Sequence, residues 1–207
     1  MSKKATNSRQ AQREATRLRI VEAAITAFTD KGFHGASTRD IAALAGTNQG
    51  LVTYHFSNKE TLWRAAADHL FAHLDARLGP RIVALRENKT ATYAREAIRE
   101  YVRFVAETPA LFRLMVDEGR VADERMQWLV DAHIRPRYDM ITTELSDVSG
   151  LNKQMIPHAF YALAGASSLI FAVAPECQRL TGIDPQSTDA IEAHADFVSG
   201  LILPAAD

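Results

Sequence analysis

The side chains with the clearest chemical potential lie in residues 37–59. A short helix is predicted near the middle of this segment, and its polar or small positions are Gln49, Gly50, Thr53 and Tyr54. Such side chains hydrogen bond to base edges, and glycine lets the backbone come close, so they suit the major groove of DNA, which is about 12 Å wide. Lys59 follows at the start of another predicted helix, where its charge and the free backbone N–H groups could hold a phosphate.

Two short helices must position these side chains. Ser37, followed three residues later by Asp40, is typical of a capped helix start, and Gly46 is expected to end that helix in a left-handed conformation. Thr47 and Asn48 then supply a fresh N-cap. Two helices joined by a short glycine-containing turn form a helix-turn-helix. Its predicted inward-facing residues are Ile41, Leu44, Val52 and Phe56.

The rest of the chain is also predicted to be helical. Apolar residues recur at the spacing of one helix face, and no segment alternates with period two for long enough to indicate a strand. About nine helices are expected, near residues 13–31, 37–45, 47–56, 57–78, 94–107, 111–119, 126–149, 154–174 and 191–202. Gly79 and Pro80 are expected to end the fourth helix, and Pro136 to kink the seventh. The predicted fold class is all-α.

Charge is unevenly spread along the 207 residues, whose formal net charge is −1. Residues 1–64 hold ten basic and five acidic side chains, whereas residues 65–207 hold fourteen and twenty. An anionic partner is therefore expected for the front of the chain only. Residues 154–175 carry no charge, and we interpret them as a helix buried on all sides within the protein, with no membrane span.

Several functional classes find no support in the sequence. The chain contains no nucleophile elbow, P-loop or dinucleotide-binding motif, so no enzyme and no cofactor are predicted. With a single cysteine and no signal peptide, we expect a cytoplasmic protein. His69 and His73 share a helix face but have no further ligand at a metal-binding spacing, so no metal site is predicted. A sensing role for these histidines or for Cys177 stays open.

The helix-turn-helix region resembles the signature of the tetracycline-repressor (TetR) family. The matching residues are 38–62, TRDIAALAGTNQGLVTYHFSNKETL, preceded by 20–33, IVEAAITAFTDKGF. The resemblance implies an Ω-shaped homodimer that represses transcription by occupying a palindromic operator in double-stranded DNA. It implies a flexible basic arm over residues 1–12, a helix-turn-helix DNA-binding domain over 13–64, and a larger helical ligand-binding and dimerisation domain over 65–207.

The resemblance also assigns DNA contacts by motif position. Thr38 would contact a phosphate, and Thr47 and Asn48 would begin the recognition helix. The base-facing residues would be Gln49, Gly50 and Thr53. The residues facing the DNA backbone would be Tyr54, His55 and Lys59. The family often has an aromatic residue where this chain has Thr53, which we therefore expect to touch a thymine methyl group. Packing on the first helix and helix capping are the alternatives for Tyr54 and His55.

The rear domain is rich in aromatic and methionine residues, which the resemblance places around an inducer pocket. The candidate lining residues are Phe104, Met115, Trp128, Phe160 and Tyr161. The candidates for orienting a polar ligand are Arg103, His133 and Tyr138. Such a lining suggests an apolar or aromatic inducer. Ordinary core packing is the alternative for each of these residues.

A dimer interface is expected on the last two helices, because the uncharged helix has small residues that allow close approach. The candidate interface residues are Gly165, Ser167, Phe197, Val198 and Leu201. Packing within one chain is the alternative.

The most specific expectation is a repressor that a small molecule releases from its operator. The alternative is a constitutive DNA-binding regulator or architectural protein whose rear domain binds a protein. A cavity lined by Phe104, Trp128 and Tyr161 would favour the first, and a filled core the second.

Overall fold

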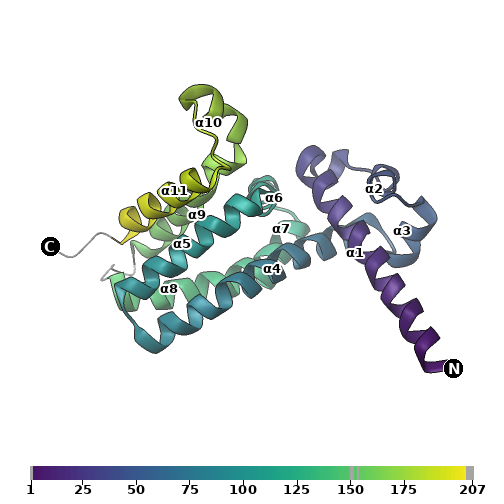
Figure 1. The fold of residues 1–207 in the computed structure, drawn as a ribbon, viewed down its shortest axis with the longest axis horizontal. Coiled ribbons are helices and arrows are strands. Elements are labelled where there is room, and N and C mark those ends of the chain that lie inside the picture. Colours follow the sequence, from purple (N-terminus) through teal and green to yellow (C-terminus); the bar gives the residue numbers. More distant parts are fainter. Residues whose placement is uncertain (1, 150–151, 153, 204–207) are drawn as a thin grey trace. The chain divides into compact units, whose positions relative to one another are not determined.

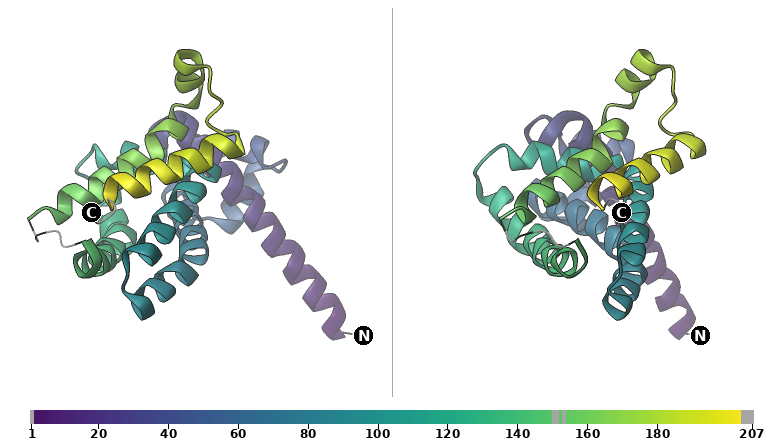
Figure 2. Two further views of the ribbon diagram at one scale, coloured as in Figure 1. Left: turned by 60° about the vertical axis from the view of Figure 1, so that its left-hand side comes forward. Right: turned by 90° about the vertical axis from the view of Figure 1, so that its left-hand side faces the viewer.

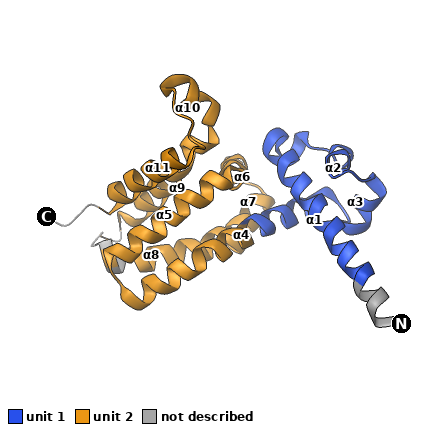
Figure 3. Cartoon of the chain, in the orientation of Figure 1, with its two compact units in different colours: residues 1–70 blue, residues 71–207 orange. Residues whose placement is uncertain are grey.

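The computed structural model of the chain describes residues 2–149, 152 and 154–203, without the side chains of 2–7, 145–147 and 149. This part of the chain contains helices and no strand (Figure 1), which confirms the all-α fold class. It forms two compact units, Met1–Leu70 and Phe71–Asp207 (Figure 3).

The first unit consists of α1 (Ser2–Gly35), α2 (Thr38–Leu44), α3 (Gln49–His55) and the start of α4 (Lys59–Asn88). The backbone of residues 2–12, predicted as a flexible arm, is helical in the structure. No glycine or proline occurs between Ser2 and Lys31, so nothing in the sequence stops the helix from extending. A kink interrupts α1 at Gly32, whose φ is 67°.

The core of the first unit lies where α1, α2, α3 and α4 converge. Three of the predicted inward-facing residues are buried, namely Ile41, Val52 and Phe56. The prediction for Leu44 is wrong, because its side chain is 57% exposed. The small side chains of Ala42 and Ala45 lie on the buried stripe of α2 with Ile41, and Leu44 falls outside that stripe.

The fourth helix does not end at Gly79 and Pro80, as the sequence predicts, but continues to Asn88. Pro80 cannot donate a hydrogen bond to the carbonyl of Ala76. Both residues are exposed, so water can satisfy that carbonyl. Beyond the proline, Leu85 is buried, and this packing outweighs the local preference for a break.

The second unit contains the end of α4 and most of the remaining helices. They are α5 (Ala91–Glu107), α6 (Pro109–Gly119), α7 (Glu124–Leu129), the π-helical turn η1 (Val130–Ile134), α8 (Arg135–Ser149), α9 (Ile156–Ala172), α10 (Ala174–Thr181) and α11 (Thr188–Ile202). The run α7–η1–α8 is the predicted long helix, but its irregularity precedes Pro136. The N–H of Arg135 reaches back five residues to the carbonyl of Val130, which makes the turn π-helical.

The core of the second unit is built around α5, which packs against both α9 and α11 (Figure 2). Ile98, Val102 and Val105 recur on one face of α5 and are buried. The helix α9 also contacts α6 and α8. Its central position lets α9 bury Leu163 and Phe171 against these neighbours.

The uncharged helix is not buried on all sides, which corrects the sequence-based expectation. Tyr161 is 74% exposed and Leu169 57% exposed on one face of α9. Within the described residues, no single helix is long and apolar enough to cross a membrane, although the pair α9 and α10, bent by 75°, meets the criteria of length and composition together. The sequence did not predict α10, which begins with a proline near its first position, a common helix start.

We predict that Gly46→Ala destabilises the protein by about 1 kcal/mol, because Gly46 has a φ of 61°, where a side chain is strained. A Cβ atom at Gly46 would meet no other atom within 4 Å, so the cost is conformational and not steric. Urea unfolding measures the change. Gly79→Ala, inside α4 and also uncrowded, is the matched control and should stabilise the protein by about 0.5–1 kcal/mol. Equal effects of both substitutions would contradict the prediction.

Candidate nucleic-acid interface and ligand cavity

Capping bonds fix the start of both helices in the helix-turn-helix. The Ser37 hydroxyl accepts a hydrogen bond from the Asp40 backbone N–H at 3.1 Å. The Asn48 side-chain oxygen accepts one from the Leu51 N–H at 3.0 Å. Between them, the positive φ of Gly46 turns the chain. These bonds agree with the predicted caps and hold α3 in a defined orientation on α2, which it contacts.

The exposed face of α3 carries the predicted base-facing residues. Gln49, Gly50 and Thr53 are exposed, whereas Val52 between them is buried. The Gln49 amide donates to the Thr38 hydroxyl at 3.2 Å, and the Thr53 hydroxyl donates to the Gln49 carbonyl at 3.1 Å. Thr38, at the start of α2, therefore belongs to the same polar face.

Two further positions at the start of α3 have structural roles. Thr47 is half-buried in the turn, and Asn48 uses its side-chain oxygen for the cap. A Cβ atom on Gly50 would lie 3.1 Å from that oxygen. The small size of Gly50 therefore protects the capping bond, in addition to leaving room for a nucleic acid.

Two arginines of α1 lie beside the end of α3, which the sequence analysis did not anticipate. The Arg13 guanidinium lies 5.4 Å from the centre of the exposed Tyr54 ring, and Arg17 lies 5.2 Å from that of Phe56. The sequence signal for this arrangement was the four-residue spacing of the two arginines, which places both on one face of a helix. Burial and these two positive charges lower the pKa of His55, so its imidazole is neutral at neutral pH.

Lys59 makes contacts within its own unit. Its ammonium donates to the Ala36 carbonyl at 3.1 Å and lies 4.5 Å from the centre of the Phe33 ring. These contacts tie the first residue of α4 to the end of α1 and to the residue that follows it. A lysine ammonium has three donors, so further bonds remain open to Lys59.

The second unit contains a cavity of about 880 Å³. Four of the eight predicted ligand-binding residues line it, namely Met115, Tyr138, Phe160 and Tyr161. The lining also includes Tyr101, whose pKa is raised by burial. Most of the other lining residues are apolar, as expected for a site that binds an apolar molecule.

The other four predicted ligand-binding residues lie outside this lining. Phe104 is completely buried and packs against His73. His133 is buried, stacks on Phe71 with ring centres 4.4 Å apart, and meets the Trp128 ring edge-on. Their aromatic character indicated a buried position, but the sequence could not distinguish the core from the cavity wall.

Arg103, the remaining residue of that group, belongs to an ion-pair network between α5 and α11. It donates to Glu192 at 2.6 Å and pairs with Glu100 on its own helix. The bonds to Glu192 raise the pKa of Arg103. Burial raises the pKa of Glu100, but Arg77 and Arg103 outweigh it and hold the pKa below its ordinary value. Glu100 therefore stays ionised and holds α4 and α5 together.

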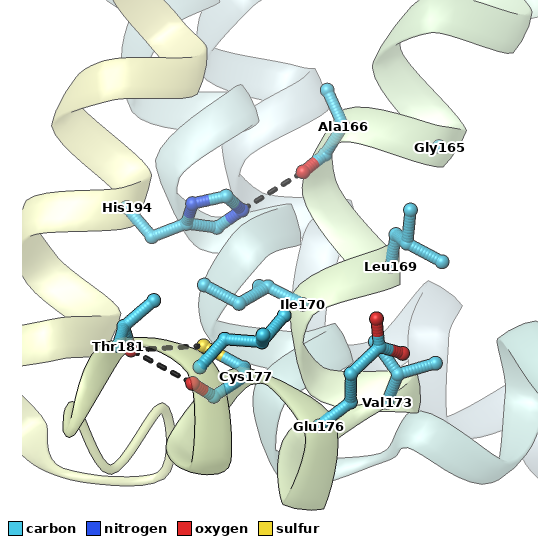
Figure 4. Close-up of a pocket in the computed structure, with 10 residues that line it drawn as sticks. Gly165, Ala166, Leu169, Ile170, Val173, Glu176, Cys177, Thr181 and His194 are labelled. Atoms are coloured by element: carbon cyan, nitrogen blue, oxygen red, sulfur yellow. Dashed lines mark hydrogen bonds between the residues drawn. The ribbon is translucent and has the colours of Figure 1, made fainter.

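A smaller pocket of about 460 Å³ lies among α9, α10 and α11 (Figure 4). The His194 imidazole points to the Ala166 carbonyl, 2.8 Å away, and burial lowers the pKa of His194 despite this bond. Cys177 lies near Thr181, with sulfur and hydroxyl 3.8 Å apart. The described residues form no group of three or more possible metal ligands.

Exposed apolar side chains occur on both α9 and α11, two helices in contact with each other, and form a candidate interaction face. Of the predicted interface residues, Phe197 and Leu201 are exposed on this face, and Gly165 is half-buried. Ser167 and Val198 are completely buried inside the unit, which leaves neither any surface for a second chain. For these two, the core-packing alternative holds.

Comparison with known proteins identifies relatives, some of which match most of the chain. Residues 20–66 match the family model described as bacterial regulatory proteins, tetR family. The HTH-type transcriptional repressor Rv3405c of Mycobacterium tuberculosis (strain ATCC 25618 / H37Rv) is 31% identical over 201 residues, which cover 93% of this chain and 92% of the relative. RutR of Escherichia coli (strain K12), a transcriptional regulator, is 35% identical over 104 residues, which cover 50% of this chain and 46% of RutR.

Solved structures share the fold. AibR in complex with isovaleryl coenzyme A and operator DNA matches with a TM-score of 0.71 at 17% identity, covering 92% of this chain and 100% of that one. FadR from Bacillus subtilis in complex with stearoyl-CoA matches with a TM-score of 0.58 at 16% identity, covering 92% and 99%.

The resemblance inferred from residues 38–62 is thus confirmed, and with it the expectation that the protein is a regulator and not an enzyme. From the family model matched by its helix-turn-helix and a relative similar along nearly its whole length, the chain belongs to the TetR family of bacterial regulatory proteins.

Proposed function

We propose that the protein is a transcriptional repressor that binds a palindromic operator as a homodimer in the cytoplasm and is released by a small, largely apolar ligand. The proposal that a ligand releases the protein from DNA rests on one observation, the cavity of about 880 Å³ in the second unit. A protein-binding regulator without a ligand would not need such a space, so the cavity supports the repressor, although of Phe104, Trp128 and Tyr161 only Tyr161 lines it.

DNA recognition is assigned to the polar face of α3. Gln49 and Thr53 are exposed and, being held by local hydrogen bonds, lose little conformational freedom on binding. Arg13 and Arg17 add positive charge beside Tyr54 and His55, where phosphates would lie. Because His55 is neutral, it would act as a hydrogen-bond donor and not as a cation.

Ligand recognition is assigned to the cavity, with Met115, Tyr138, Phe160 and Tyr161 in its wall. Its volume falls within the range of small-molecule sites, about 300–1,000 Å³. AibR and FadR, which share the fold, have structures with isovaleryl coenzyme A and stearoyl-CoA. Both ligands have an apolar acyl chain, which agrees with the mainly apolar lining here.

Dimerisation is assigned to the exposed face of α9 and α11. Tyr161, Gly165 and Leu169 follow one another at four-residue spacing, so they form a stripe along α9. Phe197 and Leu201 form a matching stripe on α11. An apolar face of two adjacent helices can form a four-helix bundle with its copy around a two-fold axis. Such a dimer would present its two α3 helices to successive major grooves, about 34–36 Å apart.

The proposed function is tested by binding to DNA upstream of the protein's own gene, at a stated salt concentration, with and without a panel of apolar and aromatic metabolites. We expect specific binding that one compound releases, since a ligand shifts the equilibrium by its preference for one conformation. Specific binding that no compound in the panel or in a cell extract releases would favour the constitutive regulator.

We predict that Gln49→Ala lowers operator affinity by about 1–3 kcal/mol and relaxes the choice of base at one position, because it removes a direct base contact. Lys59→Met should weaken binding to all DNA sequences alike and reduce the slope of log affinity against log salt by about 1. Fluorescence anisotropy with operator and scrambled DNA measures both effects. A Lys59→Met protein that melts earlier but keeps its salt slope would show that Lys59 only stabilises the fold.

We predict that Phe197→Glu converts the proposed dimer to a monomer, because it places a charge on the apolar face that the dimer would bury. Light scattering after gel filtration measures the mass, and the variant should also lose most of its operator affinity. Val121→Glu replaces another exposed apolar residue, outside α9 and α11, and should remain dimeric. A dimeric Phe197→Glu protein would place the interface elsewhere.

A further inference from the structure

The wall of the large cavity contains more positive than negative charge. Its charged residues are Arg86, Arg120, Arg135, Arg137, Asp75 and Glu144. Two of the arginines are paired, Arg137 with Asp75 and Arg86 with Glu144. An otherwise apolar cavity with excess positive charge suits a ligand that combines an apolar body with an anionic group.

Arg137 is held in place by groups other than its carboxylate partner. It donates to the His133 carbonyl in the π-helical turn, and its guanidinium lies 4.6 Å from the centre of the Phe71 ring. The side chain is only 17% exposed. The guanidinium would therefore keep its position even without the carboxylate.

Asp75, in contrast, depends on Arg137. Its two oxygens accept from two nitrogens of the guanidinium, with Nε and Oδ1 3.0 Å apart. Within the described part of the chain Asp75 has no other polar partner, and its side chain is 60% exposed. Because most of the Asp75 carboxylate is already in water, its departure costs little as long as a ligand anion takes its place and keeps the mostly buried Arg137 paired.

The pair also joins two helices, because Asp75 lies on α4 and Arg137 on α8. Opening the pair removes a polar tie between the cavity wall and α4. That helix begins at Lys59, within the helix-turn-helix unit, and continues unbroken past Asp75. A change at residue 75 therefore acts on the helix that also belongs to the DNA-binding unit.

We propose that Arg137 is the anion receptor of the cavity and that Asp75 occupies it until the carboxylate or phosphate of an apolar ligand takes its place. The proposal rests on the function proposed above, in which this cavity binds the releasing ligand. Arginine pairs with both anions through two parallel hydrogen bonds, so the ligand group can reproduce the geometry that Asp75 gives up. Displacement of Asp75 would then favour the conformation of α4 that binds DNA poorly.

The test uses three probes with one alkyl chain, namely decanoate, decanol and decanoyl-CoA, measured by isothermal titration calorimetry with the full chain. Decanoate or decanoyl-CoA should bind more tightly than decanol, and the comparison of the two identifies carboxylate or phosphate as the preferred anion. Asp75→Asn should bind the anionic probe about tenfold more tightly, because its competitor is gone. Arg137→Gln should lose the preference for the anion.

The matched control is Arg86→Gln, which breaks the other ion pair of the wall. There the carboxylate is the buried partner and the arginine is exposed, so no fixed cation is lost and the preference should persist. Arg137→Lys keeps the positive charge but cannot form two parallel hydrogen bonds, so it should retain part of the preference for the anion. This variant keeps the proposal testable if Arg137→Gln misfolds. Equal binding of decanoate, decanoyl-CoA and decanol, an unchanged preference in Arg137→Gln, or no tighter binding in Asp75→Asn would overturn the proposal.

Operator release is measured separately, so that the two proposals can fail independently. Asp75→Asn without ligand should bind the operator several-fold more weakly than the wild type. If the anionic probe binds through Arg137 but the operator stays bound, the anion-binding role of Arg137 is supported, and the proposal that such a ligand releases the operator is wrong. If a neutral compound releases the operator while Arg137→Gln responds normally, the repressor function stands and the anion receptor is wrong.

Discussion

One hydrogen-bonded helix, α4, belongs to both units of the molecule, and the cores of both depend on it. This helix supplies Trp63 to the core of the first unit and Leu74 and Leu85 to that of the second. A helix transmits axial and rotational displacements because each turn is bonded to the next. Pro80 has no N–H for the backbone hydrogen bonds of α4, but the chain stays helical there. Packing in both units therefore acts on one continuous helix, which under the proposed function would receive the effect of ligand binding in the cavity.

The helix α9 serves two surfaces at once. Its inner side packs on α5 and contributes Phe160 to the cavity wall, while its outer side presents the apolar stripe that we assign to dimerisation. In the proposed dimer the outer side would also be covered, which would explain why the helix has no charged residue although its own chain does not enclose it. Tyr161 belongs to both surfaces, since it lines the cavity and is largely exposed. Ligand binding and subunit contact are therefore expected to influence each other through one helix.

Local chemistry could be predicted from the sequence, whereas tertiary contacts could not. Caps such as Ser37 and Asn48 depend on a few neighbouring residues, so the start of α2 and of α3 could be identified in advance. The passage of α4 through Pro80 depends on packing beyond the proline, which no local rule contains. The pairing of Asp75 with Arg137 joins positions 62 residues apart, and nothing in either segment indicates the other. The aromatic character of Phe104 and His133 likewise indicated their burial but not whether they lie in the core or the cavity wall, and Tyr161 is 74% exposed.

The environment of His55 has a consequence for how the proposed DNA-binding face responds to pH. Histidine ordinarily titrates near pH 6.5, within the range that a cell can reach under acid stress. Burial and the neighbouring Arg13 and Arg17 lower the pKa of His55, so this side chain gains its proton at a lower pH than an ordinary histidine does. Under the function proposed above, the two arginines that would attract phosphate thus also disfavour a third positive charge on the DNA-binding surface.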